Sequence, residues 1–92
     1  MSDVDRNALI AALEAEDLRV TEWTDDAGTS YAPHAHEHIE VRVVLEGSMT
    51  IMADGHTHHL RPGDRIDLAP GQLHSARIGE GGVRYLAGSL RT

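Results

Sequence analysis

The sequence predicts an all-β domain that carries one short helix at its N-terminus. From Leu18 onward, short β-rich runs alternate with turn signals built from Gly, Pro and Asp. Apolar residues at helical spacing come before that point, within residues 1–17. A chain of 92 residues suits one small domain, and it shows no domain boundary or low-complexity tract. Many short strands at regular spacing are typical of a sandwich or a barrel.

The first predicted element is a short amphipathic helix over residues 1–17, which packs on a barrel formed by residues 18–92. Asp3 or Asp5 can cap the N-terminus of this helix. The apolar residues that recur at helical spacing are Leu9, Ile10 and Leu13.

The predicted strands follow one another closely along the rest of the chain. They are Leu18–Thr24, Glu40–Leu45, Ser48–Ala53, His56–Leu60, Arg65–Leu68, His74–Ile78 and Val83–Ala87. The Asp54-Gly55 pair predicts a tight hairpin turn. The glycine-rich residues 79–82 are expected to form a loop between the last two strands.

Composition excludes several classes of function. Fifteen acidic against eight basic residues give a formal charge of −7, which disfavours nucleic acid and anionic membranes as partners. The chain has no cysteine, so disulfides, thiolate zinc sites and cysteine nucleophiles are excluded. No apolar run is long enough to span a membrane, and the N-terminus lacks a signal-peptide pattern. We therefore expect a soluble, cytoplasmic protein.

The predicted core is small and lacks phenylalanine. Hydrophobic residues make up 40% of the chain but aromatic residues only 3%, so Val, Leu, Ile and Ala must supply the packing. A core of this size often gains support from a bound metal or from a second copy of the chain.

Seven histidines are present, and one group of them predicts a metal site. In the segment His34-Ala35-His36-Glu37-His38-Ile39-Glu40, an extended chain would project positions 34, 36 and 40 to the same side. Imidazoles and carboxylates are ligands that divalent transition metals prefer. The alternative is a set of surface histidines on a polar strand. A helical zinc-protease motif is excluded because His36-Glu37-His38 lacks the required two-residue gap.

The spacing of these residues resembles the two motifs of the cupin superfamily. The first motif is Gly28-x5-His34-x-His36-x3-Glu40-x6-Gly47, and the second is Gly63-Asp64-x5-Pro70-Gly71-x2-His74. The second motif departs from the family pattern in two ways. Ala69 occupies the usual proline position, and Ile78 stands where an asparagine is expected. Neither change removes a metal ligand, and the resemblance spans over half of the chain.

The resemblance implies a double-stranded β-helix, a small jelly-roll barrel with a metal inside it. The implied ligands are His34, His36, Glu40 and His74, with one or two coordination positions left for water or substrate. Such a site suits Fe²⁺, Mn²⁺, Ni²⁺, Co²⁺, Cu²⁺ or Zn²⁺.

Three further residues are candidates for a catalytic role. Arg42 lies two residues after Glu40 in the same strand, so it should also point inward. There it could bind a substrate anion or form a salt bridge to Glu22, Asp67 or another strand carboxylate. His38 is expected at the barrel rim and Tyr31 near the substrate, and either could move protons. Core packing remains the simpler interpretation of Tyr31.

The neighbouring residues give further expectations. Glu46 is expected on the inward face with Glu40 and Arg42. In the segment His56-Thr57-His58-His59, His58 is expected to share a face with Leu60 and to be partly buried. Trp23 and Tyr85 are expected in the core or lining a cavity. The opposite, apolar face of the strand from Glu40 to Leu45 requires a cover, either the N-terminal helix or a second protomer, and we therefore expect a homodimer.

These features lead to three candidate functions. The first is a metal-dependent enzyme of oxygenase, isomerase or decarboxylase type that acts on a small organic acid or a sugar-derived compound. The second is a non-catalytic module or sensor that binds a metal or a small ligand. The third is an interaction domain in which the site is a relict that no longer binds metal.

Overall fold

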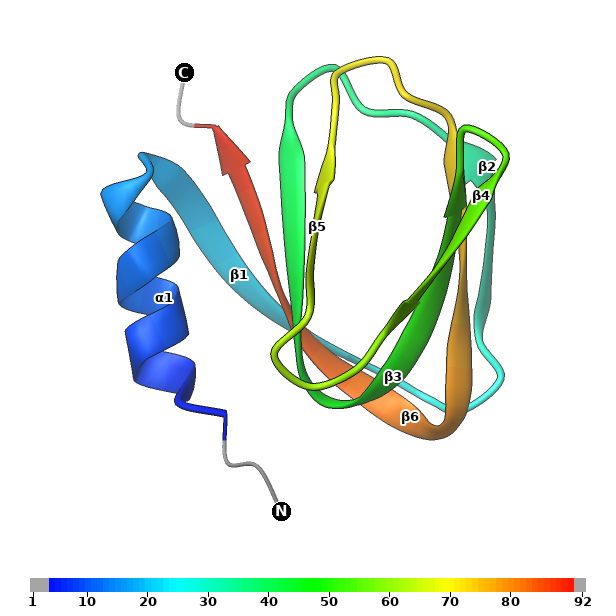
Figure 1. Ribbon diagram of the computed structural model, residues 1–92, viewed down its shortest axis with the longest axis horizontal. Coiled ribbons are helices and arrows are strands. Elements are labelled where there is room, and N and C mark those ends of the chain that lie inside the picture. The colour runs from blue at the N-terminus through cyan, green and yellow to red at the C-terminus, as the bar shows by residue number, and fades with distance from the viewer. Residues whose placement is uncertain (1–3, 91–92) are drawn as a thin grey trace.

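The computed structural model describes residues 4–90 and contains one helix and six strands in that range (Figure 1). The elements are α1 (Arg6–Ala15), β1 (Leu18–Asp25), β2 (Ser30–His34), β3 (Glu40–Ala53), β4 (His56–Leu60), β5 (Arg65–Leu68) and β6 (His74–Leu90). All strand pairs are antiparallel. These findings confirm the predicted all-β class with a short N-terminal helix.

Two long strands, β3 and β6, pair with each other and take part in two facing layers. The second half of β3 and the first half of β6 form one layer with β4 and β2 at its sides. The first half of β3 and the second half of β6 form the other layer with β5 and β1. Figure 1 shows both strands bending at the closed end of the barrel. The result is the predicted small jelly roll.

Aliphatic side chains fill the space between the two layers. This interior cluster consists of Val44, Met49, Ile51, Ala53, Leu60, Ile66, Leu68, Ala76, Ile78, Val83 and Tyr85. It contains one aromatic residue, in keeping with the composition of the chain. Residues at one end of this interior remain polar, and they form the site described below.

A second apolar cluster joins α1 to the outer face of the layer that contains β1. The buried members of this cluster are Leu13, Leu18, Val41, Val43, Leu45 and Leu86. The Asp5 carboxylate caps the helix by accepting from the Ala8 N–H at 3.0 Å. Burial of each leucine or valine contributes about 1.5–3 kcal/mol, so the helix is held mainly by packing.

The helix thus provides the cover that the apolar face of β3 requires. The predicted homodimer is therefore no longer needed to cover this face, but it stays a prediction.

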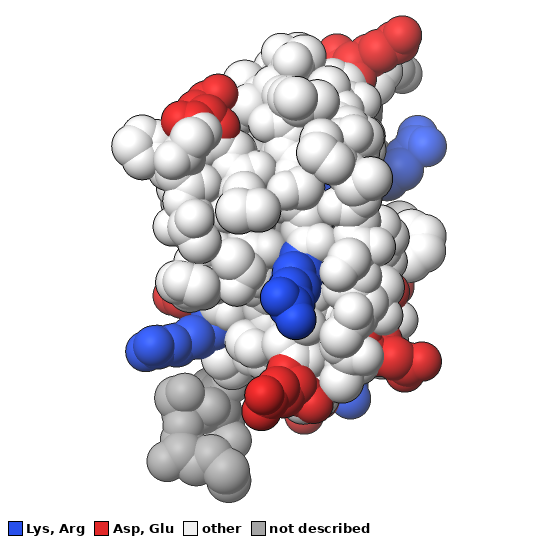
Figure 2. Space-filling model, turned by 90° about the vertical axis from the view of Figure 1, so that its right-hand side faces the viewer, with Lys and Arg blue, Asp and Glu red and all other residues white. Residues whose placement is uncertain are grey.

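The outer face of the other layer is open, with Met52 and Leu73 exposed by 55% and 61%. Figure 2 shows this face, which is mostly uncharged apart from one basic side chain just below its centre and has acidic side chains toward its margins. In the described part of the chain, no helix is long and apolar enough to cross a membrane.

Several predicted element boundaries were wrong. The helix spans Arg6–Ala15 rather than residues 1–17, and the candidate cap Asp3 lies outside the described residues. The two strands predicted on either side of Gly47 form the single strand β3, and residues 79–82 lie within β6. Gly47 pairs with Val83 and so continues β3, while residues 79–82 lie at the register shift between the pairs Gly47–Val83 and Met49–Ile78.

Two predicted side-chain positions were also wrong. Glu46 was predicted to point inward with Glu40 and Arg42, but it is exposed and pairs with Arg84 at 2.9 Å. The reason is a register shift between Val44 and Glu46, which ends the alternation of inward and outward side chains along β3. His58 lies on the same face as Leu60 but is exposed, because β4 is a side strand and the interior packing reaches only its end at Leu60.

Gly47 provides a test of the bend in β3. Its φ is +75°, and a Cβ there would lie 2.0 Å from the Gly82 carbonyl oxygen. Gly55 has the same φ, but a Cβ there would meet nothing within 4 Å. We expect Gly47→Ala to lower the free energy of unfolding by about 2–5 kcal/mol, since overpacking adds to backbone strain. The control Gly55→Ala should lower it by about 1–2 kcal/mol. Chemical denaturation measures both, and equal losses would contradict the close approach of the two backbones.

Candidate metal centre

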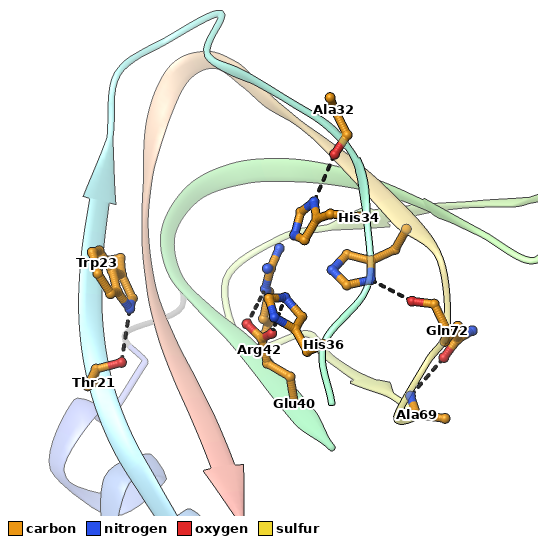
Figure 3. Close-up of polar contacts among 10 residues, drawn as sticks. Thr21, Trp23, Ala32, His34, His36, Glu40, Arg42, Ala69 and Gln72 are labelled. Atoms are coloured by element: carbon orange, nitrogen blue, oxygen red, sulfur yellow. Dashed lines mark hydrogen bonds and ion pairs between the residues drawn. The ribbon is translucent and has the colours of Figure 1, made fainter. Parts of the chain in front are cut away.

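Three histidines meet at the open end of the barrel. His34 is the last residue of β2, His36 follows in the loop to β3, and His74 is the first residue of β6. One ring nitrogen from each lies within 4.8 Å of the other two. The ring centroids are 4.4–5.1 Å apart. Figure 3 shows His34 and His36 beside Glu40 and Arg42 around one space.

Strand pairing and one loop contact bring these rings together. A register shift after Tyr31 places His34 directly opposite His74 in the β2–β6 ladder. His36 lies outside the ladder, and its carbonyl oxygen accepts a hydrogen bond from the Gly71 N–H at 2.8 Å. The loop that precedes His74 therefore holds the loop that contains His36.

Backbone contacts determine which ring nitrogen faces the centre. The Nδ1 atom of His34 lies 2.8 Å from the Ala32 carbonyl oxygen, and that of His74 lies 3.0 Å from the Gln72 carbonyl oxygen. Because a carbonyl oxygen only accepts, Nδ1 carries the proton in both rings. Each Nε2 atom then keeps a lone pair for a metal, which is the usual arrangement of histidine ligands.

Two buried nitrogen atoms support this interpretation. Among the described residues, the buried side-chain N and O atoms that lack a hydrogen-bond partner are His36 Nε2 and His74 Nε2. An unpaired buried polar atom costs about 1–3 kcal/mol, so two at one place are unusual unless a ligand joins them. Burial, followed by the charge of Arg42, lowers the pKa of His74 and keeps its ring neutral at pH 7. Neutral imidazole is the form that binds metals, so these residues fit a divalent transition metal.

Glu40, the fourth predicted ligand, lies at the edge of this group rather than within it. Its Oε2 atom is 2.7 Å from His36 Nε2, although the contact lacks the geometry of a hydrogen bond. Its Oε1 atom accepts from Arg42 Nε at 3.1 Å. A carboxylate oxygen and a ring nitrogen that lie this close without a shared hydrogen bond repel each other through their lone pairs. A cation bound by both atoms would offset that repulsion. The role of Glu40 as a ligand stays a prediction.

Arg42 points inward, next to Glu40. It is 7% exposed, and its guanidinium carbon lies 5.8 Å from the centroid of the Tyr85 ring. Two roles were considered for Arg42, an intramolecular salt bridge and the binding of a substrate anion, and its position is compatible with both. It has an intramolecular carboxylate partner, which is Glu40 rather than Glu22 or Asp67. It also lines a cavity beside the histidines.

This cavity has a volume of about 220 Å³ and extends from His34 and Glu40 toward Trp23 of β1. Its wall includes His34, Arg42 and three aromatic side chains, Trp23, Tyr31 and Tyr85. Trp23 and Tyr31 are partly exposed at its margin, whereas Tyr85 is buried. Trp23 and Tyr31 thus line a cavity rather than fill the core. We refer to this space as the side pocket.

The two candidates for proton transfer occupy different environments. The Tyr31 hydroxyl donates to Asp25 Oδ2 at 2.8 Å, and this hydrogen bond raises the pKa of Tyr31. His38 is exposed in the bend between β2 and β3, outside the group of three histidines. The catalytic roles of Arg42, His38 and Tyr31 stay predictions.

Two other features of the structure do not add a second metal site. His56 and His58 are exposed, with ring centroids 6.5 Å apart, and in residues 4–90 a single group of three or more potential ligands is close enough to hold an ion. A cavity of about 330 Å³ lies where β3 and β6 bend. Its wall carries carboxylates and Arg84, which already pairs with Glu46.

Sequence reasoning missed the residues that orient the site. Gln72 holds His74 through its carbonyl oxygen, while its side chain accepts from the Ala69 N–H at 2.8 Å and donates to Asp54 at 2.5 Å. Figure 3 shows Gln72 to the right of His34 and His36, together with its contact to Ala69. Asp25 was missed as the partner of Tyr31. Neither residue carries a spacing signal, because both contacts depend on how loops meet in the folded chain.

Comparison with known families and structures agrees with the fold. Residues 18–91 match the family described as the AraC-like ligand binding domain. No curated protein sequence matches the chain.

Three of the similar solved structures illustrate the range of relatives. KdgF from Halomonas sp. is 27% identical, with a TM-score of 0.71 over 83% of this chain and 71% of that one. An RmlC-like cupin from Shewanella frigidimarina NCIMB 400 is 29% identical, with a TM-score of 0.70 over 82% of this chain and 68% of that one. The DMSP lyase DddQ from Ruegeria pomeroyi DSS-3 is 25% identical, with a TM-score of 0.74 over 82% of this chain but only 39% of that one. The predicted resemblance to cupins is confirmed.

The Tyr31–Asp25 hydrogen bond predicts a change in the alkaline titration of the protein. The chain has two tyrosines, and burial raises the pKa of Tyr85 to about 12. In a Tyr85→Phe background, the phenolate absorbance should report Tyr31 alone. We expect its pKa to lie above the ordinary value of 10.0 and to fall toward that value in Asp25→Asn. Asp26→Asn serves as the control and should leave the titration unchanged. An Asp25→Asn curve that matches the control would show that the hydrogen bond is absent in solution.

Proposed function

Because the chain belongs to the AraC-like ligand-binding domain family, we propose that it binds a small molecule at a divalent transition metal. We propose further that it is a metal-dependent enzyme acting on a small organic acid or a sugar-derived compound. The observation that carries this proposal is the convergence of three imidazoles, two of them with unpaired buried Nε2 atoms, beside a cavity that His34 lines.

The chain's own residues would divide the work as follows. His34, His36 and His74, with Glu40, would hold the metal, and its bound form would supply Lewis acidity toward a substrate oxygen. Arg42 would orient an anionic group in the side pocket, next to His34. The aromatic wall would exclude water from that end of the ligand.

The relatives support an enzyme in general terms. One similar structure is a DMSP lyase, although this chain spans only 39% of its length. The family description itself favours the second candidate, a non-catalytic ligand-binding module. The two candidates need the same residues, so metal binding is tested first and turnover second.

We expect the purified protein to bind one divalent transition metal and to gain stability from it. At a metal concentration a hundred times the Kd, linkage adds about 2.7 kcal/mol, or roughly 10–20 °C in Tm for a domain of this size. His74→Ala should lower the affinity for Ni²⁺ or Co²⁺ at least about a hundredfold, because a ligand is lost. Thermal shift and calorimetric titration measure these effects.

The control for this experiment is His58→Ala, which removes an exposed histidine outside the group. It should leave both the Tm gain and the affinity unchanged. A wild-type protein that neither contains nor binds a metal would instead support a relict site.

Turnover separates an enzyme from a binding module. The protein is reconstituted anaerobically with each metal in turn and mixed with small carboxylic acids and sugar acids, with and without oxygen. We expect substrate consumption that stops when the metal is chelated and that is absent in His74→Ala. Saturable binding without conversion under every metal would favour the binding module.

A further inference from the structure

The hydrogen-bonding state of the side pocket restricts what it can bind. Most polar groups on its wall already have a partner within the protein. The Trp23 Nε1–H donates to Thr21 Oγ1 at 2.9 Å, and the Tyr31 hydroxyl donates to Asp25 at 2.8 Å. The Glu40 carboxylate is engaged by Arg42 and lies against His36.

Apart from His34 Nε2, which faces the metal centre, two groups on the wall remain available to a ligand, and both are donors. Arg42 uses Nε for Glu40, and within residues 4–90 its two η nitrogens have no hydrogen-bond partner. In the described range the atoms that are both fully buried and unpaired belong to histidines, so the η nitrogens of Arg42 are not fully buried, and Arg42 lines the side pocket. The Tyr85 hydroxyl is likewise without a partner in the described range. Its pKa of about 12 keeps it protonated and able to donate.

Hydrogen-bond donors therefore predominate among the free groups. A guanidinium only donates, and a carboxylate only accepts, with two oxygens that match the fork of an arginine. A sugar presents several hydroxyl groups that each need a donor and an acceptor. Because the available groups here are mainly donors, many hydroxyls of a bound sugar would stay unpaired, at a cost in affinity.

The shape of the pocket adds a second restriction. Its volume of about 220 Å³ is below the range of roughly 300–1,000 Å³ that is typical of drug-sized ligands. Three aromatic side chains, Trp23, Tyr31 and Tyr85, form much of the wall. The cation–π position over Tyr85 is already taken by Arg42, which disfavours a cationic ligand. A flat, apolar body can stack against the remaining ring faces.

We infer that the side pocket selects small carboxylic acids with a planar, unsaturated body and rejects sugars. Arg42 and Tyr85 bind the carboxylate, and Trp23 packs against the body. This inference narrows the substrate class of the proposed function and rests on it only for the placement of the ligand next to the histidines.

The single tryptophan of the chain makes this inference measurable, because Trp23 lines the pocket. The probes are benzoate and crotonate as planar acids, acetate as an acid without a body, benzamide as an uncharged planar analogue, and xylose. Each is titrated into metal-free and Ni²⁺-loaded protein while the fluorescence of Trp23 is followed. We expect benzoate or crotonate to quench the fluorescence and to bind at least about tenfold more tightly than acetate or benzamide. Xylose should leave the fluorescence unchanged.

Variants assign the selectivity to particular groups. Arg42→Gln should lower the affinity for benzoate by about tenfold to a hundredfold and abolish the preference over benzamide. Tyr85→Phe should lower it severalfold. The matched control is Arg77→Gln, which removes an exposed arginine on the outer face of β6 and should change nothing. If Arg42→Gln fails to fold, Tyr85→Phe decides.

The outcomes separate this inference from the metal proposal. Selective binding of planar acids to protein that binds no metal would support the inference while contradicting the proposed function. Metal binding accompanied by binding of xylose, or by equal affinity for benzoate and benzamide, would overturn the inference and leave the metal centre in place. Failure of every acid to bind either form would also overturn it.

Discussion

The antiparallel pairing of β3 with β6 is the interaction on which both the fold and the site depend. Each strand contributes one half to each layer, so this one ladder holds the two layers together. It places Glu40 and Arg42 in one layer and His74 at the start of the other. Because both strands bend where Gly47 meets Gly82, the site residues face one another across the open end rather than lying along a flat sheet.

The cost of the site is concentrated in a few buried polar atoms. His36 Nε2 and His74 Nε2 are buried without hydrogen bonds, and Arg42 is almost fully buried with one carboxylate partner. A small aliphatic core has little stability to offset such groups. A bound cation would satisfy the two nitrogen atoms and would also stabilise the domain by linkage. The metal centre and the stability of the fold are therefore coupled in our proposal.

The metal centre and the side pocket adjoin at His34 and Glu40, and the two differ in chemical character. At one end, lone pairs on imidazole nitrogens can accept a cation. At the other, Arg42 and Tyr85 offer donors within an aromatic wall. Glu40 lies between them, in contact with both His36 and Arg42. A ligand that carries an acceptor group and a flat body can use both ends at once, which gives a physical basis for the substrate class we infer.

The sequence by itself determined the fold class and the hairpin at Asp54-Gly55, which depend on local rules, namely strand alternation and turn chemistry. Alternation also placed His34 and His36 on one side of the chain, whereas His74 was assigned to them through the resemblance to the cupin motifs. Only the tertiary structure decided the continuity of β3 and β6, because pairing with distant partners overrides the local preference of glycine to end a strand. The same ladder contains the register shift that leaves Glu46 exposed and paired with Arg84, and no residue pattern in the sequence indicates this shift. The tautomers of His34 and His74 and the free donors of the side pocket also depend on contacts between loops and layers, which no single segment contains.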